Sequence, residues 1–318
     1  MVMKLGEYTF RVATHECGKS GTATLPTICN YLQEAACLNA KELGFNKSDF
    51  EAAGEDITWV LTKLKVVVKR YPCWAENLTV RTFPRGGRKI VAWRDFEILD
   101  SDGRRIVAAS SEWMIINMTT RKIVPVPQSV LDLADTGIAP VLGTEPFSRL
   151  KWVGRVAPST AAAGTECRPY RTLQPRHSDI DINGHVNNVH YLEWMLEEYP
   201  ERRPLELEMV FKSETMLGTD VLVESAPTDD GGICHRVFDA EGHDHVIAVT
   251  RLVPPEITYN SDTKIRDMVL RGLQKKEGYC PCRLPKTPEF FCPCEEFRGQ
   301  MADPNYHGFC HCRLYQKT

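Results

Sequence analysis

The chain uses one structural pattern twice, and this repeat limits the folds open to it. In each copy a helix with one apolar stripe is followed by several strand-like runs. The first helix is predicted over 25–44 and the second over 186–199, where Pro200 ends it. One apolar helix beside a set of antiparallel strands is an α+β layer arrangement. We therefore expect an internal duplication, with two such units in one chain.

The strands of both units are predicted from runs of apolar and β-branched residues. In the first unit these runs are 57–69, 78–83, 89–99 and 105–117. In the second unit they are 205–214, 220–225, 234–238 and 245–253. The dipeptide Asp102-Gly103 indicates a hairpin turn between the last two strands of the first unit.

Proline-rich breaks divide the chain into parts. We expect an N-terminal unit over 1–125, a linker over 126–165, a C-terminal unit over 166–255 and a tail over 262–318. The linker contains a run of small residues at 159–164 and a predicted short helix at 129–134. Pro254-Pro255 marks the second boundary.

Composition excludes several classes of protein. With 318 residues, 42% of them hydrophobic and 25% charged, the chain is typical of a globular protein. Its 39 basic and 42 acidic residues give a net charge of −3, so the chain has no overall positive electrostatic field that would attract nucleic acid. No export signal and no run of about 18 apolar residues is present, so we expect a cytoplasmic protein without a membrane partner.

Three polar residues precede the second helix in a pattern suited to hydrolysis. Asp181, Asn183 and His185 are spaced two apart, so an extended backbone would place them on one face. A carboxylate, an amide and an imidazole can orient water, move a proton and hold a polarised carbonyl, and the N-terminus of the helix favours an oxyanion. The alternative is that Asp and Asn here only form a turn and a helix cap.

This segment resembles the acyl-acyl carrier protein thioesterases, whose second half carries the motif Asp-x-Asn-x-His-Val-Asn-Asn before a Tyr- and Trp-bearing helix. The resemblance extends over residues 5–255. Further matching stretches are Trp59 to Thr62, Arg70 to Trp74, Arg94 to Phe96, Ser111 to Met114 and Leu222 to Ser225. The resemblance implies a double hot-dog fold. It also implies hydrolysis of the thioester between a fatty acyl chain and acyl carrier protein, in fatty acid biosynthesis.

The resemblance also implies which residues are catalytic. The family's Asp, Asn and His fall on Asp181, Asn183 and His185, and its downstream Glu falls on Glu214. Plant members have Cys after that Glu, whereas this chain has Thr215, so we expect activated water instead of a cysteine nucleophile. Glu214 or Asp181 would be the base, His185 would relay the proton, and Asn183 with a helix N–H would hold the thioester oxygen.

Strand periodicity argues against one of these assignments. Strict alternation over 205–214 places Glu214 on a polar strand face with Glu206, Glu208 and Lys212. A bulge near Ser213 would be needed to turn Glu214 inward.

The resemblance places the acyl chain mainly in the first unit. Candidate wall residues there are Trp59, Leu61, Trp93 and Trp113, for which ordinary core packing is the alternative. A basic cluster around a Gly86-Gly87 turn is a candidate docking site for the acidic carrier protein, or else a solvated turn. Its members are Arg81, Arg85, Arg88 and Lys89.

Half of the twelve cysteines crowd the tail as three Cys-x-Cys pairs, which indicates a soft-metal or redox site. Zinc more often uses Cys-x-x-Cys, and an iron-sulfur cluster would take four thiolates and leave two for a disulfide. The tail resembles the catalytic subunit of ferredoxin-thioredoxin reductase, although its gaps between pairs, 9 and 15 residues, differ from those of the plant subunit.

That second resemblance implies a [4Fe-4S] cluster held by Cys280, Cys292, Cys294 and Cys310, with zinc as the alternative. It implies Cys282 and Cys312 as the redox-active pair and thioredoxin or ferredoxin as partners. The sequence thus predicts an acyl carrier protein thioesterase fused to a small, cysteine-rich helical tail. The alternatives are an acyl-CoA thioesterase, an oxidoreductase with an acyl-binding hot-dog domain, and a binding module without activity.

Overall fold

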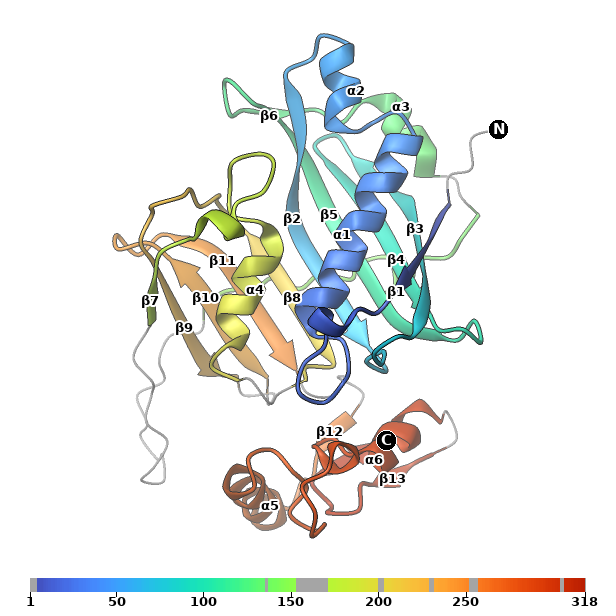
Figure 1. The fold of residues 1–318 in the computed structure, drawn as a ribbon, viewed down its shortest axis with the longest axis vertical. Coiled ribbons are helices and arrows are strands. Elements are labelled where there is room, and N and C mark those ends of the chain that lie inside the picture. Colours follow the sequence, from blue (N-terminus) through green and yellow to red (C-terminus); the bar gives the residue numbers. More distant parts are fainter. Residues whose placement is uncertain are drawn as a thin grey trace.

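The computed structural model describes residues 5–134, 137–152, 171–199, 203–228, 232–251, 257–303 and 306–317. Its main feature is one 11-stranded sheet in the order β1-β3-β4-β5-β2-β8-β11-β10-β9-β7, with β6 paired to β5. Two helices, α1 and α4, lie side by side on one face of this sheet (Figure 1). The predicted α+β duplication is therefore confirmed.

The N-terminal unit supplies half of the sheet and the longer helix. Its elements are β1 Gly6–Arg11, α1 Leu25–Glu42, α2 Lys47–Ala52, β2 Ile57–Val68, β3 Asn77–Arg88, β4 Val91–Leu99, β5 Arg105–Asn117 and β6 Ile123–Val124. Helix α1 begins where the Thr24 side chain accepts a hydrogen bond from the Thr27 N–H, with proline in its first turn. Its apolar stripe, which includes Ile28, Leu32 and Ala35, is fully buried against the sheet.

The C-terminal unit repeats this plan with shorter elements. They are β7 Arg171–Leu173, α4 Asn188–Leu196, β8 Glu206–Phe211, β9 Val221–Pro227, β10 Ile233–Phe238 and β11 Asp244–Arg251. Helix α4 begins two residues later than predicted because the Asn187 side chain caps it. The two units join where β8 pairs antiparallel with β2, with Leu64 opposite Met209. One continuous sheet and one apolar core therefore serve both units.

The predicted turn at Gly86-Gly87 is wrong. Strand β3 continues to Arg88 and β4 begins at Val91, so the chain turns after both glycines. A Cβ at position 87 would lie 2.3 Å from the Val91 carbonyl oxygen. Gly87 therefore permits close approach of two strands and does not mark a loop.

The described part of the linker crosses the sheet face that α1 and α4 leave open. It begins with α3 Gln128–Leu131 and a short 3-10 turn, where a short helix was predicted. Farther on, the Val141 N–H donates to buried Asp95 at 2.8 Å and the Ser148 hydroxyl to buried Glu208 at 2.8 Å. The linker thus satisfies buried carboxylates of the sheet. The run of small residues at 159–164 and Cys167 lie outside the described residues.

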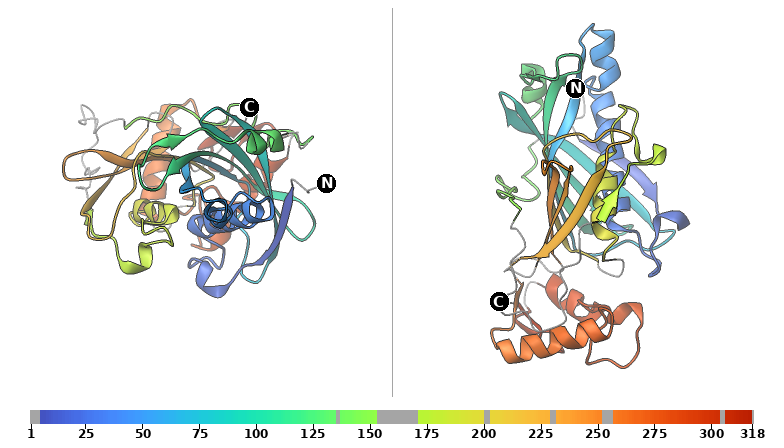
Figure 2. Two further views of the ribbon diagram at one scale, coloured as in Figure 1. Left: turned by 90° about the horizontal axis from the view of Figure 1, so that it is seen from above. Right: turned by 90° about the vertical axis from the view of Figure 1, so that its left-hand side faces the viewer.

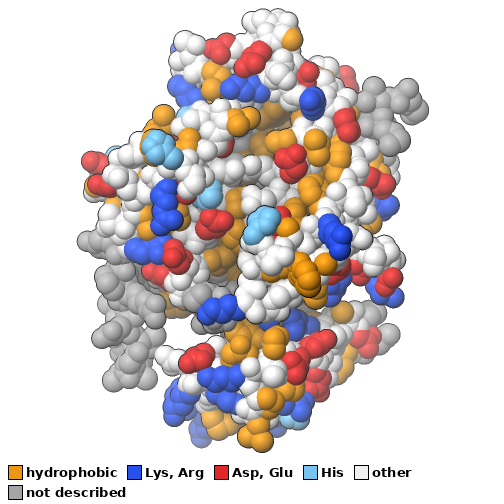
Figure 3. Space-filling view, in the orientation of Figure 1, with side chains coloured by type: hydrophobic (Ala, Val, Ile, Leu, Met, Phe, Trp, Pro, Cys, Tyr) orange, Lys and Arg blue, Asp and Glu red, His pale blue; other side chains and the backbone are white. Residues whose placement is uncertain are grey.

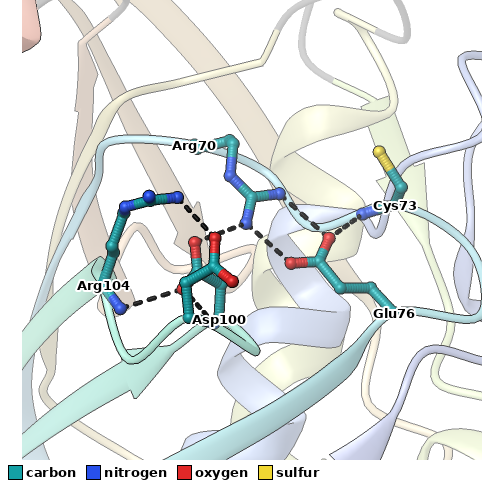
Figure 4. Close-up of polar contacts among 6 residues, drawn as sticks. Arg70, Cys73, Glu76, Asp100 and Arg104 are labelled. Carbon is teal, nitrogen blue, oxygen red and sulfur yellow. Dashed lines mark hydrogen bonds and ion pairs between the residues drawn. The ribbon is translucent and has the colours of Figure 1, made fainter.

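An ion-pair network fixes the end of the N-terminal unit from which α1 starts (Figure 4). The Arg70 guanidinium contacts Glu76 at 2.6 Å and Asp100 at 3.3 Å. Glu76 also accepts the Cys73 N–H at 2.9 Å, and Asp100 accepts the Arg104 N–H at 2.9 Å. Arg70 therefore joins the turn before β3 to the hairpin between β4 and β5.

The tail is a separate small unit beyond one end of the large sheet (Figures 1 and 2). It contains β12 Ile257–Tyr259, α5 Thr263–Lys275, α6 Glu295–Ala302, β13 Gly308–Phe309 and β14 Tyr315–Lys317. Its strands form a three-stranded sheet, so the tail is not only helical, and it begins before residue 262. The Arg203 guanidinium stacks 5.3 Å from the Phe291 ring and links the tail to the C-terminal unit. Within the described residues, no helix has the length and apolar character needed to cross a membrane.

Candidate active site

The predicted catalytic residues meet at a tight turn and not on an extended strand. The Asp181 N–H donates to the His185 carbonyl at 2.8 Å, and the Gly184 N–H donates to the Asp181 carbonyl at 3.0 Å. Gly184 has φ of +82°, a backbone conformation that favours glycine. The turn directly precedes α4. The expected convergence of Asp181, Asn183 and His185 is therefore present, but the predicted extended backbone is wrong.

The Asp181 carboxylate organises this turn. It accepts the Asn183 N–H at 2.8 Å, the His185 N–H at 3.4 Å and the Asn183 side-chain amide at 3.4 Å. A carboxylate that accepts several N–H groups of one turn fixes the conformation of that turn. These contacts show that Asp181 holds the turn in place.

Glu214 faces the same turn from the segment after β8. The strand ends at Phe211, so strand alternation no longer applies at residue 214 and no bulge is needed to turn it inward. Its Oε2 atom lies 3.3 Å from His185 Nε2, and its side chain is 30% exposed. Thr215, which follows it, is buried and accepts the Val186 N–H through its carbonyl at 3.0 Å. Glu206 and Glu208, expected on a solvated face, are instead buried.

The surroundings of His185 favour the neutral form of its imidazole. Burial lowers the pKa of His185 below its usual value, and the positive charges of Arg121 and Lys47 lower it further, while Asp181 acts in the opposite direction. The side chain is 16% exposed. A neutral imidazole with a carboxylate at one nitrogen can accept a proton at its other nitrogen.

Two cationic residues of the N-terminal unit complete the site, and the sequence did not predict them. Lys47 in α2 donates to the Asn183 side-chain oxygen at 3.3 Å. Arg121, in the turn between β5 and β6, forms an ion pair with Glu214. Neither residue lies in a motif, and Lys47 is 136 positions from Asn183, so only the assembled sheet brings them together.

A cavity of about 940 Å³ opens at these residues, and its wall comes from both units. The four predicted wall residues Trp59, Leu61, Trp93 and Trp113 all line it. The indole N–H groups of the three tryptophans are satisfied, for example Trp59 by the Phe45 carbonyl at 2.8 Å and Trp113 by Ser111 at 2.6 Å. Figure 3 shows hydrophobic side chains on the face that carries α1 and α4. The rings therefore present apolar surface next to a polar mouth.

The basic cluster of the N-terminal unit is partly engaged in contacts within that unit. Arg85 is largely buried, pairs with Asp95 at 3.1 Å and stacks 5.2 Å from the Trp93 ring. Arg88 lies over the same ring at 5.6 Å, and Arg81 pairs with Glu7 at 2.5 Å. Arg81 and Arg85 therefore pair within the N-terminal unit, while a docking role of the cluster stays a prediction.

Comparison with known proteins agrees with this geometry. The family model "Acyl-ACP thioesterase N-terminal domain" matches residues 4–134, and "Acyl-ACP thioesterase C-terminal domain" matches residues 165–252. The chain belongs to the acyl-ACP thioesterase family. Thus both units, including the 181–185 turn and Glu214, fall within the matched regions, while the tail lies outside them.

Curated thioesterases resemble the chain over most of both units. It is 32% identical over 199 residues to "Acyl-[acyl-carrier-protein] hydrolase FATB2, chloroplastic" of Cuphea viscosissima, which covers 60% of this chain and 46% of that protein. It is 30% identical to "Palmitoyl-acyl carrier protein thioesterase, chloroplastic" of Arabidopsis thaliana, over 68% of this chain and 53% of that one. The chain spans about half the length of these relatives.

Solved thioesterase structures share the double hot-dog fold. An acyl-ACP thioesterase from Bacteroides thetaiotaomicron superposes with a TM-score of 0.66 and 25% identity, over 78% of this chain and 97% of that chain. The 12:0-ACP thioesterase from Umbellularia californica superposes with a TM-score of 0.67 and 22% identity, over 79% and 97%. The predicted hot-dog fold is therefore confirmed.

The tail cysteines gather in one cluster. Cys280, Cys292, Cys294, Cys310 and Cys312 are buried with Tyr315 and Phe297, while Cys282 is exposed. Cys312 Sγ lies 3.5 Å from Cys310 Sγ, and the Tyr315 N–H donates to Cys310 Sγ at 3.3 Å. A hydrogen bond from the Cys312 thiol lowers the pKa of Cys280 to about 6. Burial raises the pKa of Cys292 and Cys294, so only part of this cluster of thiols favours the thiolate form.

Proposed function

We propose that the chain hydrolyses fatty acyl thioesters of acyl carrier protein to free fatty acid, as its family does. The observation that carries the proposal is the placement of Asn183, His185 and Glu214 at the mouth of the 940 Å³ cavity. An acyl chain would occupy the part lined by Trp59, Trp93 and Trp113, with its thioester at the polar end.

In the proposed reaction, water is the nucleophile. His185, held neutral and in contact with Glu214, takes a proton from water while the water oxygen bonds to the thioester carbon. The carbonyl π pair moves to oxygen, which the Asn183 amide and the N–H of Asn188 in the first turn of α4 stabilise. The oxyanion then collapses, the C–S bond breaks, and the proton passes to the departing thiolate.

Lys47 supports the same step through Asn183. Because the Lys47 ammonium donates to the amide oxygen at 3.3 Å, it orients the amide group of Asn183 toward donation from nitrogen. Its positive charge also favours an oxyanion nearby.

The test is a hydrolysis assay on acyl carrier protein and acyl-CoA substrates of several chain lengths. We expect His185→Gln and Glu214→Gln to lower kcat by about 10²-fold or more, the usual contribution of a general base. His190→Gln is the matched control, since His190 lies on α4 but pairs with Glu193 at 2.6 Å and does not line the cavity. Full activity of both site variants would refute the proposal. A higher kcat/KM on coenzyme A substrates would instead favour an acyl-CoA thioesterase.

For the tail we propose a redox module with a [4Fe-4S] cluster held by Cys280, Cys292, Cys294 and Cys310. Four buried thiols and a backbone N–H bonded to one sulfur suit such a group.

When bound, the cluster would supply one-electron chemistry to Cys282 and Cys312, with ferredoxin as electron donor and thioredoxin as acceptor. Cys282 is the exposed cysteine of the six and can meet a partner disulfide. Purified protein should be brown and contain about four iron atoms and four sulfides per chain. A colourless protein with one zinc ion would overturn the cluster assignment, and reduced protein that leaves a thioredoxin disulfide intact would overturn the proposed partner.

A further inference from the structure

The His185–Glu214 pair proposed for hydrolysis belongs to the C-terminal unit, but one of its contacts comes from the N-terminal unit. A single carboxylate oxygen, Glu214 Oε2, lies 3.3 Å from His185 Nε2 and also forms the ion pair with Arg121. The Glu214 carboxylate thus bridges Arg121 and the imidazole, and Arg121 lines the cavity.

We propose that Arg121 is a positioning residue of the thioesterase, which fixes the Glu214 carboxylate against His185 Nε2. This inference rests on the proposed function. Arg121 acts through Glu214, and the N-terminal unit therefore takes part in the chemistry as well as in acyl binding.

Hydrogen bonds within the turn that carries Arg121 fix the position of this residue. Arg121 has φ of +56°, which a residue other than glycine adopts only when its surroundings hold it there. Its N–H donates to the Asn117 carbonyl at 2.9 Å, and the Asn117 side chain accepts the Thr120 N–H at 2.7 Å. The Thr119 hydroxyl donates to Asp56 at 2.6 Å. This hydrogen-bonded turn lowers the entropy cost of holding the guanidinium at Glu214.

The charges around His185 show what Arg121 would control. Four charged groups face the imidazole: Asp181 of its own turn, Glu214 after β8, Lys47 of α2 and Arg121. With Arg121 in place, part of the Glu214 charge is compensated, which favours the neutral imidazole. Without Arg121, the carboxylate is free to stabilise the imidazolium, which cannot act as a base.

The experiment compares Arg121→Met, Arg121→Gln and Arg121→Lys with wild type in the full chain. Lys122→Met is the matched control, because Lys122 carries the same charge in the same turn but does not line the cavity. The measurements are kcat, KM and the pH profile of kcat/KM, together with NMR titration of the His185 ring. Thermal unfolding identifies any variant that has lost its fold.

We expect Arg121→Met and Arg121→Gln to lower kcat at least about tenfold, since misplacement of a catalytic group has this order of effect. The acid limb of the profile and the His185 titration should both move to higher pH, and Arg121→Lys should recover part of the loss. Lys122→Met should match wild type.

Folded Met and Gln variants with an unchanged kcat and an unchanged His185 titration would overturn the inference. A rise in KM alone would overturn it too, because it would assign Arg121 to substrate binding. Absence of hydrolysis by wild type would refute the proposed function instead. The NMR titration needs no turnover and would still decide whether Arg121 controls the imidazole.

Discussion

At the scale of single residues, several groups around His185 favour its neutral form. Burial and the nearby charges of Arg121 and Lys47 all oppose the imidazolium. The negative charge of Asp181 acts in the opposite direction and favours the imidazolium. The Asp181 carboxylate also accepts hydrogen bonds from N–H groups of its own turn. In the proposed reaction, His185 would therefore remain available as a base below the usual titration range of histidine.

This arrangement predicts the pH dependence of hydrolysis. Because the pKa of His185 is lowered from its ordinary value of 6.5, the active neutral form persists as pH falls below that value. We expect kcat/KM to be flat through neutral pH, with an acid limb below 6.5. A pH profile on a saturable acyl thioester checks this, and an acid limb that begins above neutral pH would contradict it.

The size of the cavity should set the length of the acyl chain. Ala36 is a buried residue of α1 that lines the cavity, so Ala36→Leu removes space from it. We expect kcat/KM to shift toward shorter chains, since each methylene in an apolar pocket is worth about 1–3 kcal/mol. The measurement is a chain-length series. Glu34→Leu, on the exposed side of the same helix, is the control, and an unchanged preference for Ala36→Leu would place the chain elsewhere.

Residues close in sequence could be predicted to act together, whereas residues from different units could not. Asp181, Asn183 and His185 stand within five positions, so their convergence follows from local structure alone. Lys47 and Arg121 reach the site only because β2 pairs with β8, a contact that leaves no pattern in either segment.

At the scale of elements, the Arg70 network ties a turn to a hairpin. The Arg70 hydrogen bond lowers the pKa of Glu76 in the folded protein. The network therefore contributes stability at neutral pH, and this contribution is lost as pH falls through the lowered pKa of Glu76.

We expect Arg70→Met to lower the free energy of unfolding by up to about 1 kcal/mol at neutral pH, because the side chain is 42% exposed and screened by solvent. The difference from wild type should shrink in acid. Urea unfolding at several pH values measures it, with exposed Lys69→Met as control. An equal loss at all pH values would mean that packing and not charge is responsible.

Secondary structure was predictable where periodicity is strong and less so where tertiary contacts decide. The predicted helix over 25–44 and strand over 105–117 agree closely with α1 and β5. Two glycines suggested a turn at 86–87, although Gly87 serves close strand approach. Glutamates at 206 and 208 suggested a solvated face, yet residues of the linker cover Glu208 there.

At the scale of the molecule, the two proposed sites lie apart. The tail is beyond the end of the sheet opposite to α2 and β6, which border the candidate active site (Figure 1). We expect Cys292→Ser to abolish the visible absorption of the proposed cluster but to leave kcat for thioester hydrolysis unchanged. Absorption spectra and initial rates check this in one preparation. A parallel loss of both would show that the tail controls the thioesterase.

The seam between β2 and β8 has an evolutionary consequence. Two identical units would each have to keep both a pocket and a set of reactive groups. In the present sheet the two halves differ, but Lys47 and Arg121 of the first half contact Asn183 and Glu214 of the second. Substitutions in one half would therefore be selected together with those in the other, and the two halves would evolve as a pair.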